Sequence, residues 1–170
     1  MRATGTDKIA DLAQQMKAGM RHLASGVAIV ATRDSHGDPF AMTVSSITSL
    51  TDSPPSLLIC LHEVAQTHAV LRQVDRFSAN ILTEAQQNVS QCCAAEPDMA
   101  QRFKVGNWAE NLQLDLPYLQ DSLSVFFCKV SQRIDYGSHM IVIGDIQAVE
   151  ISAVDQAPLV YCRGQYRQLL

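Results

Sequence analysis

Hydroxyl side chains between residues 41 and 60 are the first candidates for chemistry in this sequence. The run AMTVSSITSLTDSPPSLLIC places Thr43, Ser45, Ser46, Thr48 and Ser49 in an apolar stretch that is predicted to be a strand. Buried hydroxyls need hydrogen-bond partners, and a ligand rich in oxygen atoms would supply them. A second interpretation needs no ligand, because threonine is common in strands and serine is common in turns. Composition alone slightly favours the second interpretation.

A histidine at the start of a strand is the next candidate. His139 follows Gly137-Ser138 and opens the apolar run MIVIGDI. A neutral imidazole at the end of a strand can donate a hydrogen bond or stack against an aromatic ligand. A turn histidine satisfied by the backbone has the same pattern, and taken alone it is the simpler interpretation. His62 and His68 flank a turn and a helix start, where solvent-exposed roles are common.

Several familiar catalytic and binding motifs are absent from the sequence. None of the eight glycines falls in the order of a Rossmann dinucleotide fingerprint or a phosphate-binding P-loop. The histidines lack metal-ligand spacing, so no metal site is predicted. The five cysteines are odd in number and include no C-x-x-C pair, which argues against a disulfide framework. With no apolar signal-peptide core at the N-terminus, we expect a cytoplasmic protein.

The overall composition predicts one globular domain. The chain has 170 residues, 47% of them hydrophobic and 18% charged, and its net charge is −4. This length is enough to bury a substantial core. The basic residues are scattered and form no stripe, so we expect no nucleic-acid partner. No apolar run approaches the ~20 residues of a membrane helix, so we expect no membrane partner either.

The spacing of apolar residues predicts a mainly β fold with a few helices. A helical stripe over residues 7–24 suggests an N-terminal helical extension, residues 1–20, ahead of a single domain, residues 21–170. Residues 98–118 look irregular and would form a lid or an interface. Strands joined by short turns, without βαβ alternation, indicate a mainly antiparallel sheet that closes on itself. The predicted strands are 27–33, 40–47, 56–61, 76–82, 122–135 and 139–152, and the predicted short helices are 62–74 and 84–96.

Blocks spread along the chain together resemble the short-chain flavin reductase family. They follow the family's order from about residue 20 to the C-terminus: LASGVAIVAT, AMTVSSITSLTDSPPSLLICL, Thr67-His68, RFSANIL, Arg102-Phe103, GSHMIVIGDI and PLVYCRGQY. The TVSSITSL block and the prolines after it are the most specific. The resemblance implies an FMN-binding split β-barrel, antiparallel and Greek-key-like. It also implies a homodimer with flavin in a groove near the subunit interface.

The same resemblance implies which residues contact the flavin. One strand of the family supplies hydroxyls and amides to the ribityl chain and phosphate, and the loop after the third strand closes over the phosphate. His139 stands where the nicotinamide approaches the flavin, and it is the implied catalytic residue. By position, the implied cofactor-binding residues are Thr43, Val44, Ser45, Ser46, Leu61, His62, Ala65, Gln66, Thr67, Phe103 and Tyr166.

The sequence departs from the family pattern in the phosphate loop and in the nicotinamide turn. Here His62 stands at the position of the family's asparagine, and Ala65 replaces a serine. Glu63 brings a carboxylate that would repel a phosphate unless it pointed away. Ser138 replaces an aspartate of the turn. These departures leave the choice between FMN and FAD open.

The activity implied by the resemblance is that of an NAD(P)H:flavin oxidoreductase. It would transfer a hydride from NADH or NADPH to FMN or FAD and supply reduced flavin to a separate flavin-dependent monooxygenase. The protein's task is then to stack the two rings, which needs no nucleophile or carboxylate pair. Two alternatives remain open. One is a split-barrel flavoprotein that holds FMN tightly and reduces another acceptor, and the other is a flavin- or haem-binding protein without turnover.

Overall fold

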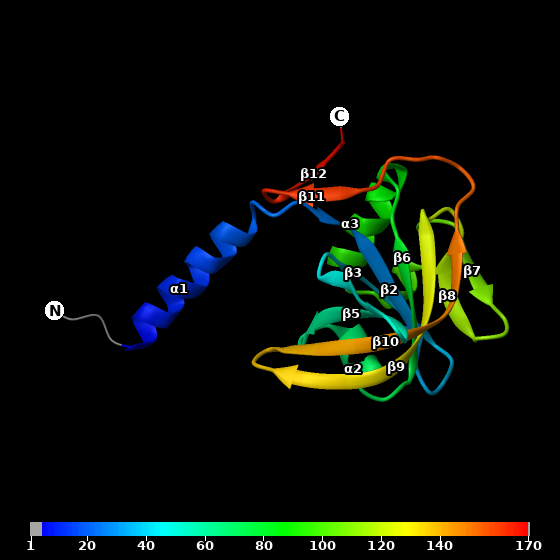
Figure 1. The fold of residues 1–170 in the computed structure, drawn as a ribbon, viewed down its shortest axis with the longest axis horizontal. Helices are drawn as coiled ribbons and strands as arrows, with labels where there is room; N and C mark the ends of the chain where they lie inside the picture. The colour runs from blue at the N-terminus through cyan, green and yellow to red at the C-terminus, as the bar shows by residue number, and fades with distance from the viewer. Residues whose placement is uncertain (1–4, 170) are drawn as a thin grey trace.

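A computed structural model describes residues 5–169 and confirms a mainly β fold (Figure 1). The strands are antiparallel, and the helices are few. In chain order the elements are α1 (Gly5–Met20), β1 (Ser25–Gly26), β2 (Ala28–Arg33), β3 (Pro39–Val44), β4 (Ile47–Asp52), β5 (Pro55–His62), α2 (Gln66–Leu71), β6 (Arg76–Ile81), η1 (Glu84–Gln86), α3 (Gln87–Ala95), α4 (Met99–Arg102), β7 (Trp108–Asn111), β8 (Leu116–Leu119), β9 (Ser124–Tyr136), β10 (His139–Ile151), β11 (Val160–Cys162) and β12 (Gln165–Arg167).

Seven strands form one antiparallel sheet whose two edges are neighbours in the sequence. The strand order is β3-β2-β6-β9-β10-β5-β4. Only Ser45 and Ser46 separate β3 from β4, so the Cα atoms of Val44 and Ile47 lie within about 11 Å of each other. The sheet must therefore curl until its edges approach. Within the described residues no ladder joins β3 to β4, so backbone hydrogen bonds do not complete the closed sheet that the sequence analysis expected.

Two predictions of local structure are wrong. The strand predicted over 40–47 ends at Val44, and a separate strand begins at Ile47 and runs to Asp52. Residues 98–118 are not irregular, because they contain α4 and the β7–β8 hairpin. The strands of this hairpin are only four residues long, and Pro117 lies in one of them. Such short strands give too few alternations for a pattern to be recognised.

Strand β2 is buried on both faces, which explains its continuous apolar sequence. Successive side chains of a strand point to opposite faces of the sheet. Ala28 and Val30 belong to an inner core, whereas Ile29 and Ala31 belong to an outer core that includes residues of α3. The inner core is completed by residues from the other strands of the sheet and from α2, among them Leu57, Ile59, Leu61, Leu71, Phe77, Met140 and Val142.

Helix α1 projects away from the β-sheet body (Figure 1). It ends at Met20, before the predicted end at residue 24. The apolar stripe predicted from the sequence has no cover within the described part of the chain, because its members are between 55% and 71% exposed. The stripe consists of Ile9, Leu12, Met16 and Met20 on the helix and Leu23 just after it.

Candidate cofactor site

The end of β5 connects the residues that the sequence analysis singled out. Ser46 is held to this strand twice, because its Oγ donates to the Cys60 carbonyl at 3.1 Å and its carbonyl accepts from the Cys60 N–H at 3.1 Å. Two residues further along, His62 faces His139 on β10. The chain then turns through Glu63 to Ala65 into α2. The hydroxyl strand, the histidine and the implied phosphate loop therefore adjoin one strand end.

The hydroxyls of the TVSS segment are not all free for a ligand. Thr43 Oγ1 donates to the Ser90 carbonyl at 2.6 Å, and Ser46 Oγ donates to Cys60. A hydroxyl has a single proton, so neither can donate to a ligand while these bonds persist. Ser45 is exposed, and its side chain has no hydrogen bond within residues 5–169. The donors that remain for a ligand here are therefore the Ser45 hydroxyl and the backbone N–H groups of Ser45 and Ser46, the two residues that link β3 to β4.

A cavity of about 380 Å³ brings the implied phosphate loop to β3 and α4. Arg102 contributes a half-buried guanidinium to its wall. The Nε of this side chain donates to the Glu96 carbonyl at 2.7 Å, and its Nη1 donates to the Ala41 carbonyl at 2.6 Å. The cavity is lined by Met42, Thr43, Val64, Ala65, Gln66, Cys93, Ala94, Pro97 and Arg102.

Arg102 lines this cavity, although the sequence did not lead us to expect it there. It forms no ion pair with any carboxylate of the described residues. A guanidinium held only by neutral carbonyls keeps its full positive charge for an anionic ligand. The signal in the sequence is the Arg-Phe pair of the family pattern, of which only Phe103 was assigned to the site.

The turn before α2 presents few side-chain donors of its own. Ala65 occupies the N-cap in an extended conformation (φ −74°, ψ 133°) and has no hydroxyl to cap the helix. Thr67 is 1% exposed, and its Oγ1 lacks a hydrogen-bond partner among the described residues. Gln66 lines the cavity. Glu63 is absent from the cavity wall, so its carboxylate does not oppose the Arg102 guanidinium there.

Four further residues of the predicted site lie away from this cavity. Val44 and Leu61 are buried in the inner core. Phe103 packs against Trp108, with ring centroids 4.4 Å apart, beside the outer core. Tyr166 hydrogen-bonds through its hydroxyl to Ser90 Oγ at 2.8 Å, one residue contact away from Thr43. None of these four residues lines the cavity.

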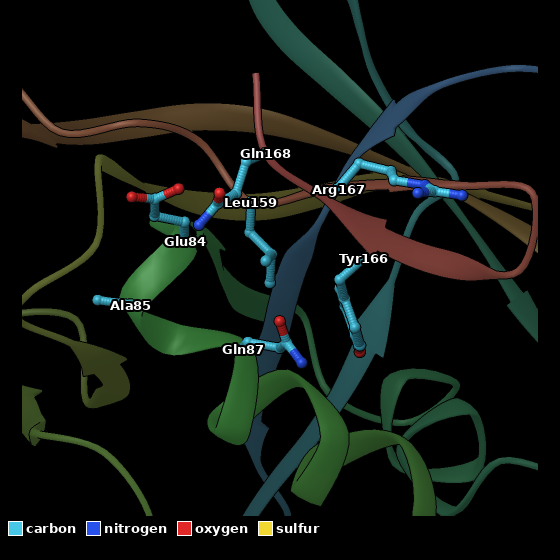
Figure 2. Close-up of a pocket in the computed structure, with 7 residues that line it drawn as sticks. All are labelled: Glu84, Ala85, Gln87, Leu159, Tyr166, Arg167 and Gln168. Atoms are coloured by element: carbon cyan, nitrogen blue, oxygen red, sulfur yellow. The ribbon is translucent and has the colours of Figure 1, made fainter. Parts of the chain in front are cut away.

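Three of the predicted residues, Ser45, Ser46 and Tyr166, line two other cavities, neither of which includes Arg102. One of about 440 Å³ includes Ser45 and Ser46 and is bounded by the end of α1 and residues 161–164. Another, of about 550 Å³, lies beside η1 and β12 and includes Tyr166 (Figure 2). In Figure 2, Arg167 directs its guanidinium away from Glu84. Of the residues predicted to bind flavin, Tyr166 alone lines this larger cavity.

The cysteines do not supply a reactive thiol to the cavity. Burial raises the pKa of the Cys93 thiol to about 12, and burial likewise raises the pKa of Cys128 to about 12. Both thiols are therefore protonated at neutral pH and are poor nucleophiles. Across residues 5–169, no three His, Cys, Asp or Glu side chains gather in a metal-binding arrangement. In the same range, no helix combines the length and apolarity that crossing a membrane requires.

The fold and site define a mainly antiparallel β protein with a cationic cavity beside a curled sheet. Residues 20–170 match the flavin reductase like domain family, and the chain belongs to this family. It is 35% identical to the reductase component of the 4-nitrophenol 4-monooxygenase/4-nitrocatechol 2-monooxygenase of Rhodococcus opacus, over 85% of this chain and 75% of that protein.

Two more relatives extend the comparison. The chain is 31% identical to the FMN reductase (NADH) RutF 1 of Methylorubrum extorquens, over 92% of this chain and 77% of that protein. Among solved structures it resembles BorF, the flavin reductase component of a bacterial two-component tryptophan halogenase. That match has a TM-score of 0.83 and 29% identity, and it covers 92% of this chain and 98% of BorF.

His68, in the first turn of α2, predicts a pH dependence of stability. Burial lowers its pKa below the ordinary value of 6.5, and the nearby Arg72 lowers it further, while Asp135 and Glu63 oppose the shift. The unfolded chain then binds a proton more readily than the folded one. The contribution of neutral His68 to the free energy of unfolding is therefore fully present above about pH 6.5, and it is lost as the pH falls below that value.

Replacing His68 with Gln should reduce the fall in stability between pH 7.5 and pH 5. Urea unfolding followed by the fluorescence of Trp108, the single tryptophan, measures this change. His36→Gln, at an exposed turn, serves as the matched control and should keep the wild-type pH dependence. An equal pH dependence in His68→Gln and the wild type would contradict the assignment.

Proposed function

We propose that this chain is an NAD(P)H-dependent flavin reductase that supplies reduced FMN or FAD to a partner monooxygenase. The observation that carries the proposal is the cavity lined by Thr43, Ala65, Gln66 and Arg102, whose guanidinium has no carboxylate partner among the described residues. Family membership supports it, as do the names of the relatives, an NADH-dependent FMN reductase and the reductase component of a monooxygenase.

The residues of the cavity fit a flavin nucleotide. Arg102 would hold the phosphate, because a guanidinium without a carboxylate partner suits that dianion. Gln66 adds amide donors, and Ser45 and Ser46, directly after β3, offer backbone N–H groups that have no backbone partner among the described residues outside the strands. Residue 43 and residue 45 are about 7 Å apart along an extended chain, so one elongated ligand can reach both. When bound, the flavin supplies the two-electron chemistry between a nicotinamide donor and an acceptor.

We assign His139 to the nicotinamide side of this site. It is exposed at the start of β10, and its Nδ1 lies 3.1 Å from Ser138 Oγ. This contact holds the imidazole at the strand end, where it can orient a planar ring or hydrogen-bond to it. His139 touches no carboxylate of the described residues within ion-pair distance. Its role would therefore be orientation rather than removal of a substrate proton.

The purified protein should oxidise NADH or NADPH steadily only when FMN or FAD is added. Absorbance at 340 nm measures the rate, with each nicotinamide paired with each flavin in turn. Tightly retained flavin with no turnover of added flavin would support the alternative of a flavoprotein that uses another acceptor. No oxidation with any pair, or a haem spectrum, would support the alternative of a binding protein and overturn the proposal.

Replacing Arg102 with Met should weaken FMN binding roughly 10- to 100-fold, because a charge-assisted hydrogen bond is worth about 1.5–3 kcal/mol. Quenching of flavin fluorescence gives the dissociation constant. Riboflavin, which lacks the phosphate, should bind both proteins with similar affinity.

Lys104→Met is the matched control, since it removes a nearby exposed cation that does not line the cavity. Arg102 also bonds to the Ala41 and Glu96 carbonyls, so unfolding by urea is measured alongside binding. An equal loss of FMN and riboflavin affinity would show that Arg102 supports the fold instead of holding the phosphate.

We further propose that the protein is a homodimer in which α1 contacts the second copy. The stripe exposes four large apolar side chains on α1 and Leu23 just after it, and such a contiguous surface is uncommon on a monomer. It continues into the cavity of Ser45 and Ser46 through Met16 and Met20. The α1 segment would then act as the N-terminal extension, residues 1–20, of a single domain formed by residues 21–170. Five free cysteines support a reducing, cytoplasmic compartment.

Charging the stripe with the double change Met16→Glu and Met20→Glu should convert the dimer to a monomer at micromolar concentration. Two buried, unpaired carboxylates would cost several kcal/mol at an apolar interface. Sedimentation velocity measures the mass. Gln14→Glu adds a charge to the opposite face of the same helix and should leave the dimer intact. A dimer that survives the double change would exclude α1 from the interface.

A further inference from the structure

We propose that His62 is a positioning residue whose ring holds the His139 imidazole in place. The inference rests on the proposed function, since it concerns the residue assigned to the nicotinamide side. It gives His62 a role through His139 rather than through the flavin. The resemblance to the family suggests no such role, because its pattern has an asparagine at this position.

The two rings meet across neighbouring strands. His62 is the last residue of β5, His139 is the first residue of β10, and the two are directly opposed in the register of the antiparallel pair. Their ring centroids are 4.7 Å apart and the ring planes make an angle of 75°. In this edge-to-face arrangement the positive edge of one ring meets the electron-rich face of the other. An asparagine at residue 62 has no ring with which to form this contact.

A backbone hydrogen bond favours one tautomer of His62. The Val64 N–H donates to His62 Nδ1 at 3.2 Å, so in the neutral ring the proton resides on Nε2. A protonated Nδ1 would turn a donor toward the Val64 N–H and lose this bond. In the favoured tautomer, Nε2–H is the one donor that the ring can offer.

A second connection ties the two strand ends together behind the rings. The Glu63 N–H donates to the Ser138 carbonyl at 2.9 Å, and Ser138 Oγ lies 3.1 Å from His139 Nδ1. His139 is thus held by Ser138 on one side and by the His62 ring on the other. Both histidines are exposed, and an exposed side chain without such supports samples several rotamers. Reducing that freedom before the nicotinamide arrives favours a productive arrangement.

The charged groups near the pair lie in its own loops, on β9 and at the end of α2. Glu63 follows His62 directly, and Asp135 on β9 pairs with Arg72 at the end of α2 at 2.5 Å. His68 of α2 is buried among these groups. None of these carboxylates lies within 4.0 Å of either exposed ring nitrogen in the described residues. Contact between the rings, rather than an ion pair, is therefore the interaction to test.

A double-mutant cycle tests the inference. His62→Ala should lower kcat/KM for NADH about tenfold, mainly through a higher KM, while the FMN dissociation constant stays within about twofold. His139→Ala should cause a larger loss, and the double change should be no worse than His139→Ala alone. His62→Phe retains a ring and should recover part of the loss, whereas His62→Asn should not. His36→Ala, at a distant exposed turn, is the matched control.

A measurement on the protein without flavin separates this inference from the proposed function. Nitrogen-15 spectra of the imidazoles report the tautomer and the environment of each ring. His62 should show the Nε2–H tautomer, and His62→Ala should shift the ring signals of His139. Unshifted His139 signals, or losses that add in the double mutant, would overturn the inference. A wild-type protein that oxidises no nicotinamide would instead overturn the proposed function, and the ring contact would still be tested by the spectra.

Discussion

The structure depends on one covalent constraint, the two-residue link Ser45-Ser46 between the outermost strands of a seven-stranded sheet. An open sheet of this size would hold its edges far apart, so the link forces the strands to curl around the inner core. Hydrogen bonds in both directions between Ser46 and Cys60 hold the link against β5. Among the described residues, no backbone carbonyl outside the strands accepts from the Ser45 or Ser46 N–H. These donors at the junction of the two sheet edges are part of the proposed flavin site.

Arg102 is held at the cavity wall because it also covers β3, which is an edge strand of the sheet. Unpaired edge groups must be covered, and α4 covers them here with side chains. Met99 Sδ accepts from the Ala41 N–H at 3.2 Å, while Arg102 donates to the Ala41 carbonyl at 2.6 Å. The same contact that protects the edge fixes a guanidinium at the cavity wall. A structural requirement of the sheet and the proposed phosphate contact thus share one residue.

Much of this arrangement could be predicted from the sequence, and the rest depends on contacts between distant residues. Alternating or continuous apolar runs predict β2, β9 and β10 well, because burial determines those patterns. The break at Ser45-Ser46 has only a short local signal, because serine is common in turns but the β-branched composition resumes at Ile47. The use of the Thr43 hydroxyl by Ser90 depends on α3, 47 residues away. The positions of Arg102 and of the His62 ring likewise depend on residues far away in the sequence, Ala41 and His139, so they could not be predicted.

We propose that flavin binds beside the Ser45-Ser46 link, with its phosphate at Arg102. A crystal structure of the protein grown with saturating FMN tests this proposal most directly. We expect phosphate density against Arg102 and Gln66, with the ring system between the Ser45-Ser46 link and His139. Flavin bound instead beside Glu84 and Tyr166, in the cavity of Figure 2, would contradict it.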